Sequence, residues 1–270
     1  MSTVTFSSTG PIDRATKDIV RGIELWRIWV RLAYQDIIAK YRRTLLGPFW
    51  VAGSTVATSI AIALVYGGLF GLSVKESLPS IAAGILTWTF MVGIVFDAPN
   101  ILLGASGTIL TLPLPITLHF WRFLLRQIFV ALHNIIAFIV VMLCVGLGFT
   151  IRPEFIPGFM LVSMICIVWA LPLGILALRY RDVMFLLGYL AQILFFLTPV
   201  FWKPEKLTGK RALFVEFNPF YYMLNLMRNP LLGGAPSAHD WLVGFGLLFT
   251  GMAVGFVAFV LYRRRIVFWL

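Results

Sequence analysis

Residues 156–178 read IPGFMLVSMICIVWALPLGILAL, with no charged side chain anywhere in the stretch. A helix needs about 20 consecutive apolar residues to cross the hydrocarbon core of a bilayer, and this stretch is long enough. Five other long and mostly apolar stretches occupy residues 48–72, 78–100, 123–149, 183–202 and 241–262. The sequence therefore predicts an all-α integral membrane protein with six transmembrane helices.

The composition supports the same class of protein. Apolar residues make up 60% of the 270-residue chain and charged residues 12%, whereas soluble domains have about 45–50% and about 25%. A soluble core of this size cannot bury so much apolar surface, so a lipid bilayer is the expected solvent. No apolar stretch precedes residue 48, so we expect no cleaved signal peptide.

The charged residues indicate a topology. The net charge is +11, and Lys and Arg cluster at the ends of the apolar stretches, which suits membrane lipid headgroups rather than nucleic acid. With a cytoplasmic N-terminus, most of the 22 basic residues fall on the inner side. The outer side then keeps Lys75, Arg152, Lys203, Lys206, Lys210, Arg211 and Arg228. The positive-inside rule therefore predicts that both termini are cytoplasmic.

The N-terminal region, residues 1–47, is predicted to hold an amphipathic helix ahead of a transmembrane domain at residues 48–270. Apolar side chains recur at three- and four-residue steps, which places them on one helix face. This face comprises Ile19, Ile23, Trp26, Val30, Ala33, Ile37 and Tyr41. Aromatic rings on one face and Arg on the other favour a helix in the membrane interface. A soluble helix packed on a partner is the alternative.

Residues 104–120 form the predicted cytoplasmic connection between the second and third spans. Pro113 and Pro115 remove backbone donors and interrupt any helix there. A short amphipathic turn before them suits contact with a cytoplasmic partner, and an ordinary connection is the alternative.

Residues 218–234 read NPFYYMLNLMRNPLLGG, which is too polar to span a membrane and too aromatic for a solvated loop. Asn-Pro pairs bracket the segment and favour turns. We predict two short helices that re-enter the membrane, where such backbone needs protein or a water-filled cavity around it. A loop on the outer membrane surface is the alternative. We expect Arg228 to meet Glu216, a backbone carbonyl or the aqueous path.

Polar side chains inside the spans are few, namely Asp97, His133, Asn134 and Gln192. Such groups serve either function or hydrogen bonds between helices. For Asp97 we expect a structural partner, such as Arg122 or a backbone donor. No cluster of His, Cys, Asp or Glu has metal-ligand spacing, so no metal site and no catalytic residue is predicted. The two cysteines, Cys144 and Cys166, are interpreted as small apolar side chains.

Four motifs follow one another along the chain: YRRTLLGPFW at residues 41–50, RYRD at 179–182, TPVFW at 198–202, and NPFYYMLNLMRNPLLGG. With the predicted topology, they resemble the channel-forming subunit of type-2 ABC exporters. The resemblance is to the branch that exports lipid-linked polysaccharides such as O antigen, capsule and teichoic acid, and it covers nearly the whole chain. The chain has no GxxxxGK[ST] loop, which fits a transport subunit whose ATPase is a separate polypeptide.

The resemblance implies a homodimer in the bacterial inner membrane, with the channel on its two-fold axis. ATP and Mg are then held by a partner ABC ATPase, and this chain binds no cofactor and is not itself an enzyme. The N-terminal helix and the loop after the second span would contact that ATPase. The segment between the fifth and sixth spans would gate the outer mouth, and aromatic side chains would line the path of the lipid-linked glycan.

Candidate site residues follow from these implied roles. A lipid pyrophosphate would meet Arg42 and Arg43, whose planar guanidinium groups suit phosphate. The candidates for the glycan channel are Trp50, Tyr66, Trp88, Tyr189 and Trp202. The candidates for the external gate are Pro219, Tyr221, Tyr222 and Arg228. The candidates for ATPase coupling are Arg27, Arg31, Gly107 and Thr108.

Other functions stay open at this point. The same superfamily includes exporters of small molecules or modified oligosaccharides, which differ mainly in aromatic content and in the re-entrant segment. A membrane-embedded transferase should show clustered interfacial carboxylates or histidines, whereas His119, His133 and His239 are scattered. A passive channel or scaffold is a third reading, and copurification with an ATPase would argue against it.

Overall fold

The computed structural model describes residues 10–45, 47, 49–146, 150–202, 204, 209 and 213–270, and every regular element in these ranges is helical. The predicted outer-side residues Lys203, Lys206, Lys210 and Arg211 lie outside the described residues, as does Pro48 at the start of the first predicted span. The helices are α1 (Pro11–Glu24), α2 (Trp26–Tyr41), α3 (Phe49–Phe70), α4 (Val74–Val95), α5 (Ala98–Leu103), α6 (Ser106–Thr111), α7 (Ile116–Cys144), α8 (Phe155–Arg179), α9 (Asp182–Leu197), α10 (Leu213–Glu216), α11 (Pro219–Leu231) and α12 (Ala238–Trp269).

In the part of the chain that the structure describes, five helices are long and apolar enough to cross a membrane, namely α3, α4, α7, α8 and α12. They correspond to five of the six predicted spans. The remaining predicted span, the fifth along the chain at residues 183–202, corresponds to the shorter helix α9, with 16 residues. It ends at Leu197 because Thr198 has an extended backbone. Thr198 precedes Pro199, and a proline disfavours helical backbone in the residue before it.

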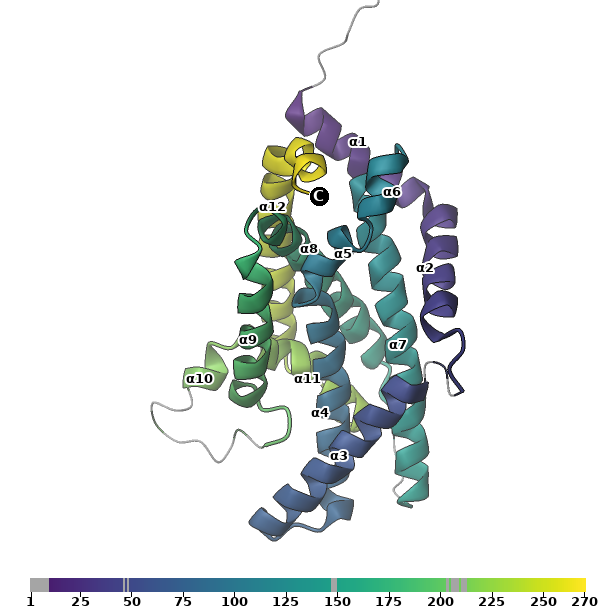
Figure 1. Cartoon of the computed structure of the whole chain (residues 1–270). Coiled ribbons are helices and arrows are strands. Elements are labelled where there is room, and N and C mark those ends of the chain that lie inside the picture. The colour runs from purple at the N-terminus through teal and green to yellow at the C-terminus, as the bar shows by residue number, and fades with distance from the viewer. Residues whose placement is uncertain are drawn as a thin grey trace, which may run out of the picture.

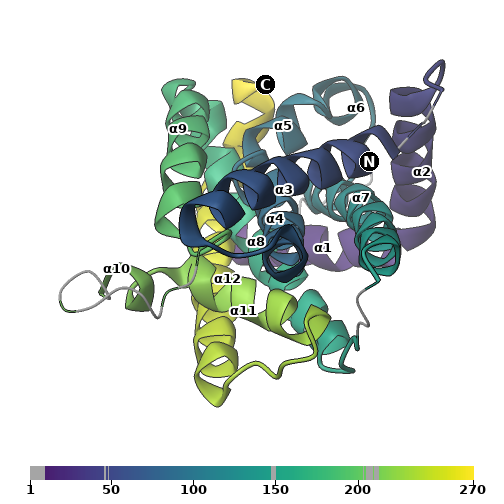
Figure 2. The ribbon, with the colours of Figure 1, turned by 90° about the horizontal axis from the view of Figure 1, so that it is seen from below.

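The spans form a bundle in which α4 and α8 are largely buried. Helix α12 runs along α8, and α4 packs against α3, α7 and α8 (Figure 1). Seen from below in Figure 2, α9 and α2 lie on opposite sides of the bundle, with α3 between them. The outer faces of α3, α7 and α12 remain largely exposed. These faces are therefore available to lipid or to another protein chain.

The N-terminal region forms two helices where the sequence predicted one. Leu25, with φ −79° and ψ 30°, interrupts the helix between α1 and α2. Helix α1 packs against α7 and α12, and α2 lies beside α7 (Figure 1). Of the predicted apolar face, Ala33 is buried, whereas Ile23 and Trp26 are about half exposed at 52% and 53%. The break at Leu25 therefore divides the predicted face between two helices.

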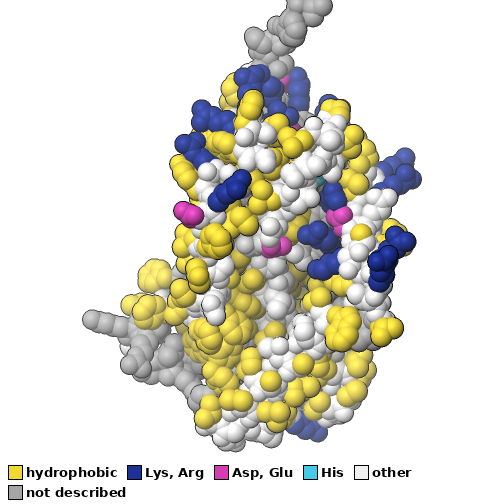
Figure 3. Space-filling model, viewed as in Figure 1, with side chains coloured by type: hydrophobic (Ala, Val, Ile, Leu, Met, Phe, Trp, Pro, Cys, Tyr) yellow, Lys and Arg dark blue, Asp and Glu magenta, His cyan; other side chains and the backbone are white. Residues whose placement is uncertain are grey.

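The two termini of the described chain lie at the same end of the molecule. Helix α1 and the last turns of α12 lie together at the top of Figure 1. Lys and Arg side chains gather over this half of the molecule in Figure 3, and we call it the basic end. Two termini on one side of the membrane require such an arrangement, and their cytoplasmic location stays a prediction.

Candidate functional site

The segment over residues 218–234 forms one helix, α11, so the prediction of two short helices is wrong. Asn218 caps it, because its side chain accepts a hydrogen bond from the N–H of Phe220 at 3.0 Å. Pro219 occupies the first turn, where no N–H donor is needed. Pro230 falls in the last turn and therefore does not divide the helix.

Helix α11 is packed between spans rather than laid over a surface. It contacts α4, α8 and α12. Its buried apolar side chains are Met223, Leu224, Leu226, Met227 and Leu231. Two glycines on the spans permit close approach of this region, because a Cβ at Gly158 would lie 2.2 Å from the carbonyl oxygen of Leu226, and one at Gly84 would lie 2.0 Å from that of Val200. Neither glycine was predicted from the sequence.

Arg228 joins α11 to the segment that follows α9. Its guanidinium donates to the carbonyl oxygen of Pro199 at 2.6 Å and to the side-chain oxygen of Asn225 at 3.2 Å. Asn225 in turn donates to Asp240 at 3.1 Å, and Asp240 forms a capping box with Ser237 at the start of α12. The backbone carbonyl expected for Arg228 is confirmed. Glu216 instead accepts a hydrogen bond at its backbone oxygen from the Tyr222 hydroxyl, at 2.7 Å.

Replacing Arg228 by Ala should lower the free energy of unfolding by about 1.5 kcal/mol, at the low end for hydrogen bonds to a charged group because the side chain is only half-buried. The loss would leave Pro199 and Asn225 without their charged donor. Denaturant unfolding of the purified chain in detergent measures the change in the free energy of unfolding. Arg264→Ala is the control, because Arg264 is exposed. Equal stability of the two variants would show that this link contributes nothing.

The four predicted gate residues differ in their surroundings. Pro219 is exposed, Tyr221 and Arg228 are half-buried, and Tyr222 is buried. The rings of Tyr221 and Tyr222 meet edge to face at 5.3 Å between centroids. Burial raises the pKa of the Tyr222 hydroxyl above its ordinary value, so it stays a neutral donor.

Two of the five predicted channel residues, Tyr66 and Trp88, share one aromatic cluster. Tyr66 contacts Phe201, Phe201 contacts Phe195, and Phe195 contacts Trp88, at centroid distances of 4.9, 5.2 and 5.8 Å. Trp88 is buried there, and Trp202 closes the end of α9 by donating to the carbonyl of Phe196 at 3.2 Å. Trp50 on α3 and Tyr189 on α9 are apart from this cluster and exposed, at 59% and 67%.

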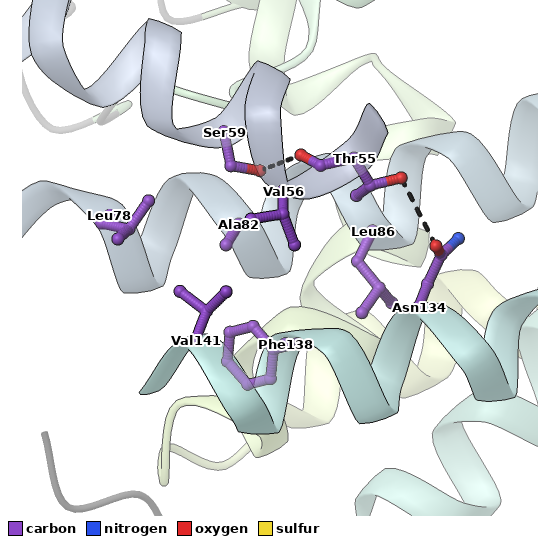
Figure 4. A pocket seen from close by; sticks show the side chains of 9 residues that line it. All are labelled: Thr55, Val56, Ser59, Leu78, Ala82, Leu86, Asn134, Phe138 and Val141. Carbon is purple, nitrogen blue, oxygen red and sulfur yellow. Dashed lines mark hydrogen bonds between the residues drawn. The ribbon is translucent and has the colours of Figure 1, made fainter. Parts of the chain in front are cut away.

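The polar residues inside the spans mostly serve hydrogen bonds within or between helices. Figure 4 shows a small cavity where α3, α4 and α7 meet, with Thr55 donating to the Asn134 side chain at 3.4 Å. Its volume is about 10 Å³, which suits one water molecule at most. The ring Nδ1 of His133 lies 2.7 Å from the carbonyl oxygen of Phe129, one turn earlier in the same helix. These contacts match the structural alternative for Asn134 and His133.

Asp97 has a structural partner, as expected, but that partner is the side chain of Asn100 and not Arg122. Asp97 accepts a hydrogen bond from the side-chain amide of Asn100 at 2.5 Å. Arg122 instead forms a two-bond pair with Asp36 of α2, at 2.7 and 2.5 Å. Arg122 pairs with Asp36 rather than with Asp97 because the two oxygens of the Asp36 carboxylate match the paired donors of the guanidinium group.

The predicted coupling and lipid-binding residues lie on exposed parts of the first helices and of α6. Arg27 and Arg31 are exposed on α2, Gly107 is exposed and Thr108 half-buried on α6, and both helices reach the basic end in Figure 1. Arg42 and Arg43 follow α2 and are exposed. Arg43 has a φ of 73°, a left-handed backbone that is uncommon for a side chain of this kind.

Asp18 joins three helices and was not predicted from the sequence. It is 3% exposed on α1, and its carboxylate accepts hydrogen bonds from the backbone N–H groups of Ile116 and Thr117 at 3.2 and 3.1 Å. Pro115, the residue before α7, has no side chain that could accept hydrogen bonds from the first N–H groups of that helix. Asp18 of α1 accepts them instead and so caps α7. The guanidinium group of Arg263 on α12 also donates to the Asp18 carboxylate, with nitrogen–oxygen distances of 2.7 and 2.8 Å. We call these residues the Asp18 cap.

Within the described residues, a bundle of five apolar helices of membrane-spanning length defines a multi-pass membrane protein. The model of the ABC-2 type transporter family matches residues 29–232, which is most of the chain. The chain therefore belongs to the ABC-2 type transporter family, whose members are membrane permease subunits that work with an ABC ATPase. A comparison with curated proteins gives no match.

Proposed function

We propose that the chain is the channel-forming subunit of a homodimeric exporter of lipid-linked polysaccharide, driven by a separate ATPase that holds ATP and Mg. The family match supports the exporter class. The order of the four sequence motifs supports the polysaccharide branch. The exposed faces of α3 and α7 offer surfaces on which a second copy could pack.

The observation that most directly supports a glycan substrate is an aromatic stripe on α9. Phe185, Tyr189 and Phe196 are 70%, 67% and 62% exposed, and their spacing places them on one face of the helix. Aromatic faces stack on the flat apolar sides of sugar rings without requiring one particular sequence of sugars. A long, repetitive glycan could therefore slide along such a stripe.

The proposed path has a defined entrance and exit. Arg42 and Arg43 bind the pyrophosphate of the lipid carrier, because exposed guanidinium groups donate paired hydrogen bonds to phosphate oxygens. Arg27, Arg31, Gly107 and Thr108 transmit the motion of the ATPase, because they are largely exposed on α2 and α6. Helix α11, held by its contacts with Gly158 and Pro199, forms the outer gate.

The test is glycan export by cells that depend on this chain, with surface glycan and lipid-linked glycan inside the cell both measured. The triple variant Phe185→Ala/Tyr189→Ala/Phe196→Ala should slow export by about tenfold or more, from three lost stacking faces of about 0.5–1.5 kcal/mol each. The glycan should then accumulate inside, and the variant should still copurify with the ATPase.

The control is a matched stripe on another span. Phe245, Phe249 and Phe256 of α12 have the same spacing and are 47%, 65% and 37% exposed. The triple Ala variant at these positions should export at the normal rate. Normal surface glycan in cells that lack the chain altogether would contradict the polysaccharide assignment while leaving the family unaffected.

A further inference from the structure

A polar cavity of about 90 Å³ lies between α2, α5 and α7. The side chains that give it its chemistry are Asp36, Asn100, His119, Arg122 and Arg126. In Figure 3, Lys and Arg side chains lie at the edge of a hollow on this face, towards the basic end. The cavity has several times the room that one water molecule needs.

His119 indicates that the cavity binds something. Its side chain is 1% exposed, and neither ring nitrogen has a hydrogen-bond partner among the described residues. A buried polar group without a partner is costly, and native structures rarely keep one. His119 also borders the cavity. Both ring nitrogens are closed off from water in this structure, so the ring has to turn for a ligand there to supply the missing partner.

The charges around the cavity favour an anion. Asp36 is the one carboxylate in the lining, and it forms its two close bonds with Arg122. Arg126 lies 3.8 Å from the same carboxylate, beyond hydrogen-bond distance, and its guanidinium stacks over Phe123 at 4.6 Å. Two guanidinium groups against one carboxylate leave a net charge of about one positive unit, before any contribution from His119.

We infer that this cavity binds a phosphate group, either free in solution or carried by a lipid headgroup. Guanidinium groups donate in a planar fork that matches phosphate oxygens, and an imidazole N–H adds a further donor. A metal ion fits poorly, because two cations flank the single carboxylate. The inference does not depend on the glycan substrate, and its residues are different from Arg42 and Arg43.

The experiment measures thermal unfolding of the purified full-length chain in a neutral, phosphate-free detergent. One arm titrates sodium phosphate against sodium chloride at matched ionic strength. The other arm adds phosphatidic acid to the micelles, against phosphatidylglycerol, whose headgroup has the phosphodiester but no terminal phosphate. Saturable stabilisation in the first arm indicates free phosphate. Stabilisation by phosphatidic acid but not by phosphatidylglycerol indicates that the cavity binds a terminal lipid phosphate. Stabilisation by both lipids indicates that it also binds a lipid phosphodiester.

Arg126→Gln should weaken that binding by about tenfold, the effect of losing one charge-assisted hydrogen bond. It leaves the close pair between Arg122 and Asp36 in place. Arg181→Gln is the matched control, because Arg181 is an exposed arginine outside the cavity. Its binding should equal that of the unmodified chain.

His119→Leu separates a ligand site from a simple structural role. Without phosphate it should unfold at the same temperature or higher, because two unpartnered nitrogens are removed. With phosphate it should gain less stability than the unmodified chain. If neither phosphate source stabilises the chain, or if Arg126→Gln and Arg181→Gln respond alike, the cavity holds only water and the inference is wrong.

Discussion

Replacing Asp18 by Ala is expected to lower the free energy of unfolding by about 3–5 kcal/mol, the usual cost of removing one partner from a buried ion pair. The substitution leaves Arg263 without its carboxylate. It also leaves the first N–H groups of α7, those of Ile116 and Thr117, without an acceptor in a buried site. Because α1 is joined to both α7 and α12 through this carboxylate, we expect α1 to detach first.

Denaturant unfolding in detergent measures the total loss, and thiol labelling of an Ala15→Cys variant measures detachment, since Ala15 is fully buried on α1. The control is Asp13→Ala on the same helix. Asp13 pairs with Lys17 at 2.8 Å on an exposed surface, so its loss should cost less than about 1 kcal/mol. Equal effects of the two substitutions would show that the Asp18 cap does not hold α1.

The spans could be predicted because each is a local property of the sequence. A stretch such as residues 156–178 has to be helical in lipid whatever its neighbours are, since its backbone groups have no other partners there. The Asp18 cap and the pair between Asp36 and Arg122 could not be predicted in this way. Their partners are far apart in the sequence, and a charge count assigns the same arginines to membrane topology.

Two of the differences between the predicted and the observed helices have a common cause, which is the position of prolines relative to helix ends. Pro199 lies just beyond α9 and shortens the expected fifth span. Pro230 lies in the last turn of α11, where it does not divide the helix as the sequence suggested. The aromatic stripe of α9 was only partly anticipated, because Tyr189 was a candidate and Phe185 and Phe196 were not. Helical spacing alone would have connected the three.

The contact between α8 and α11 depends on a missing side chain at Gly158 and a missing donor at Pro230. Proline has no N–H, so the carbonyl of Leu226, four residues earlier, accepts no helical hydrogen bond from it. That carbonyl lies against Gly158, where any Cβ would come within 2.2 Å of its oxygen. The obstacle is backbone, which cannot rotate away as a side chain could. A larger residue at position 158 must therefore separate α11 from α8.

Gly158→Val should consequently destabilise the chain by about 3 kcal/mol, at the upper end of the usual range for overpacking. Gly246→Val on α12 is the control, since Gly246 has open space around it and valine is no worse than glycine in a helix. Its stability should change by less than about 0.5 kcal/mol. Met223 on α11 is buried in the unmodified chain. A cysteine at this position, Met223→Cys, should become accessible to thiol reagents when combined with Gly158→Val and stay protected when combined with Gly246→Val. Protection of that cysteine in both backgrounds would mean that α11 stays packed without the glycine contact, and that this contact does not fix its position.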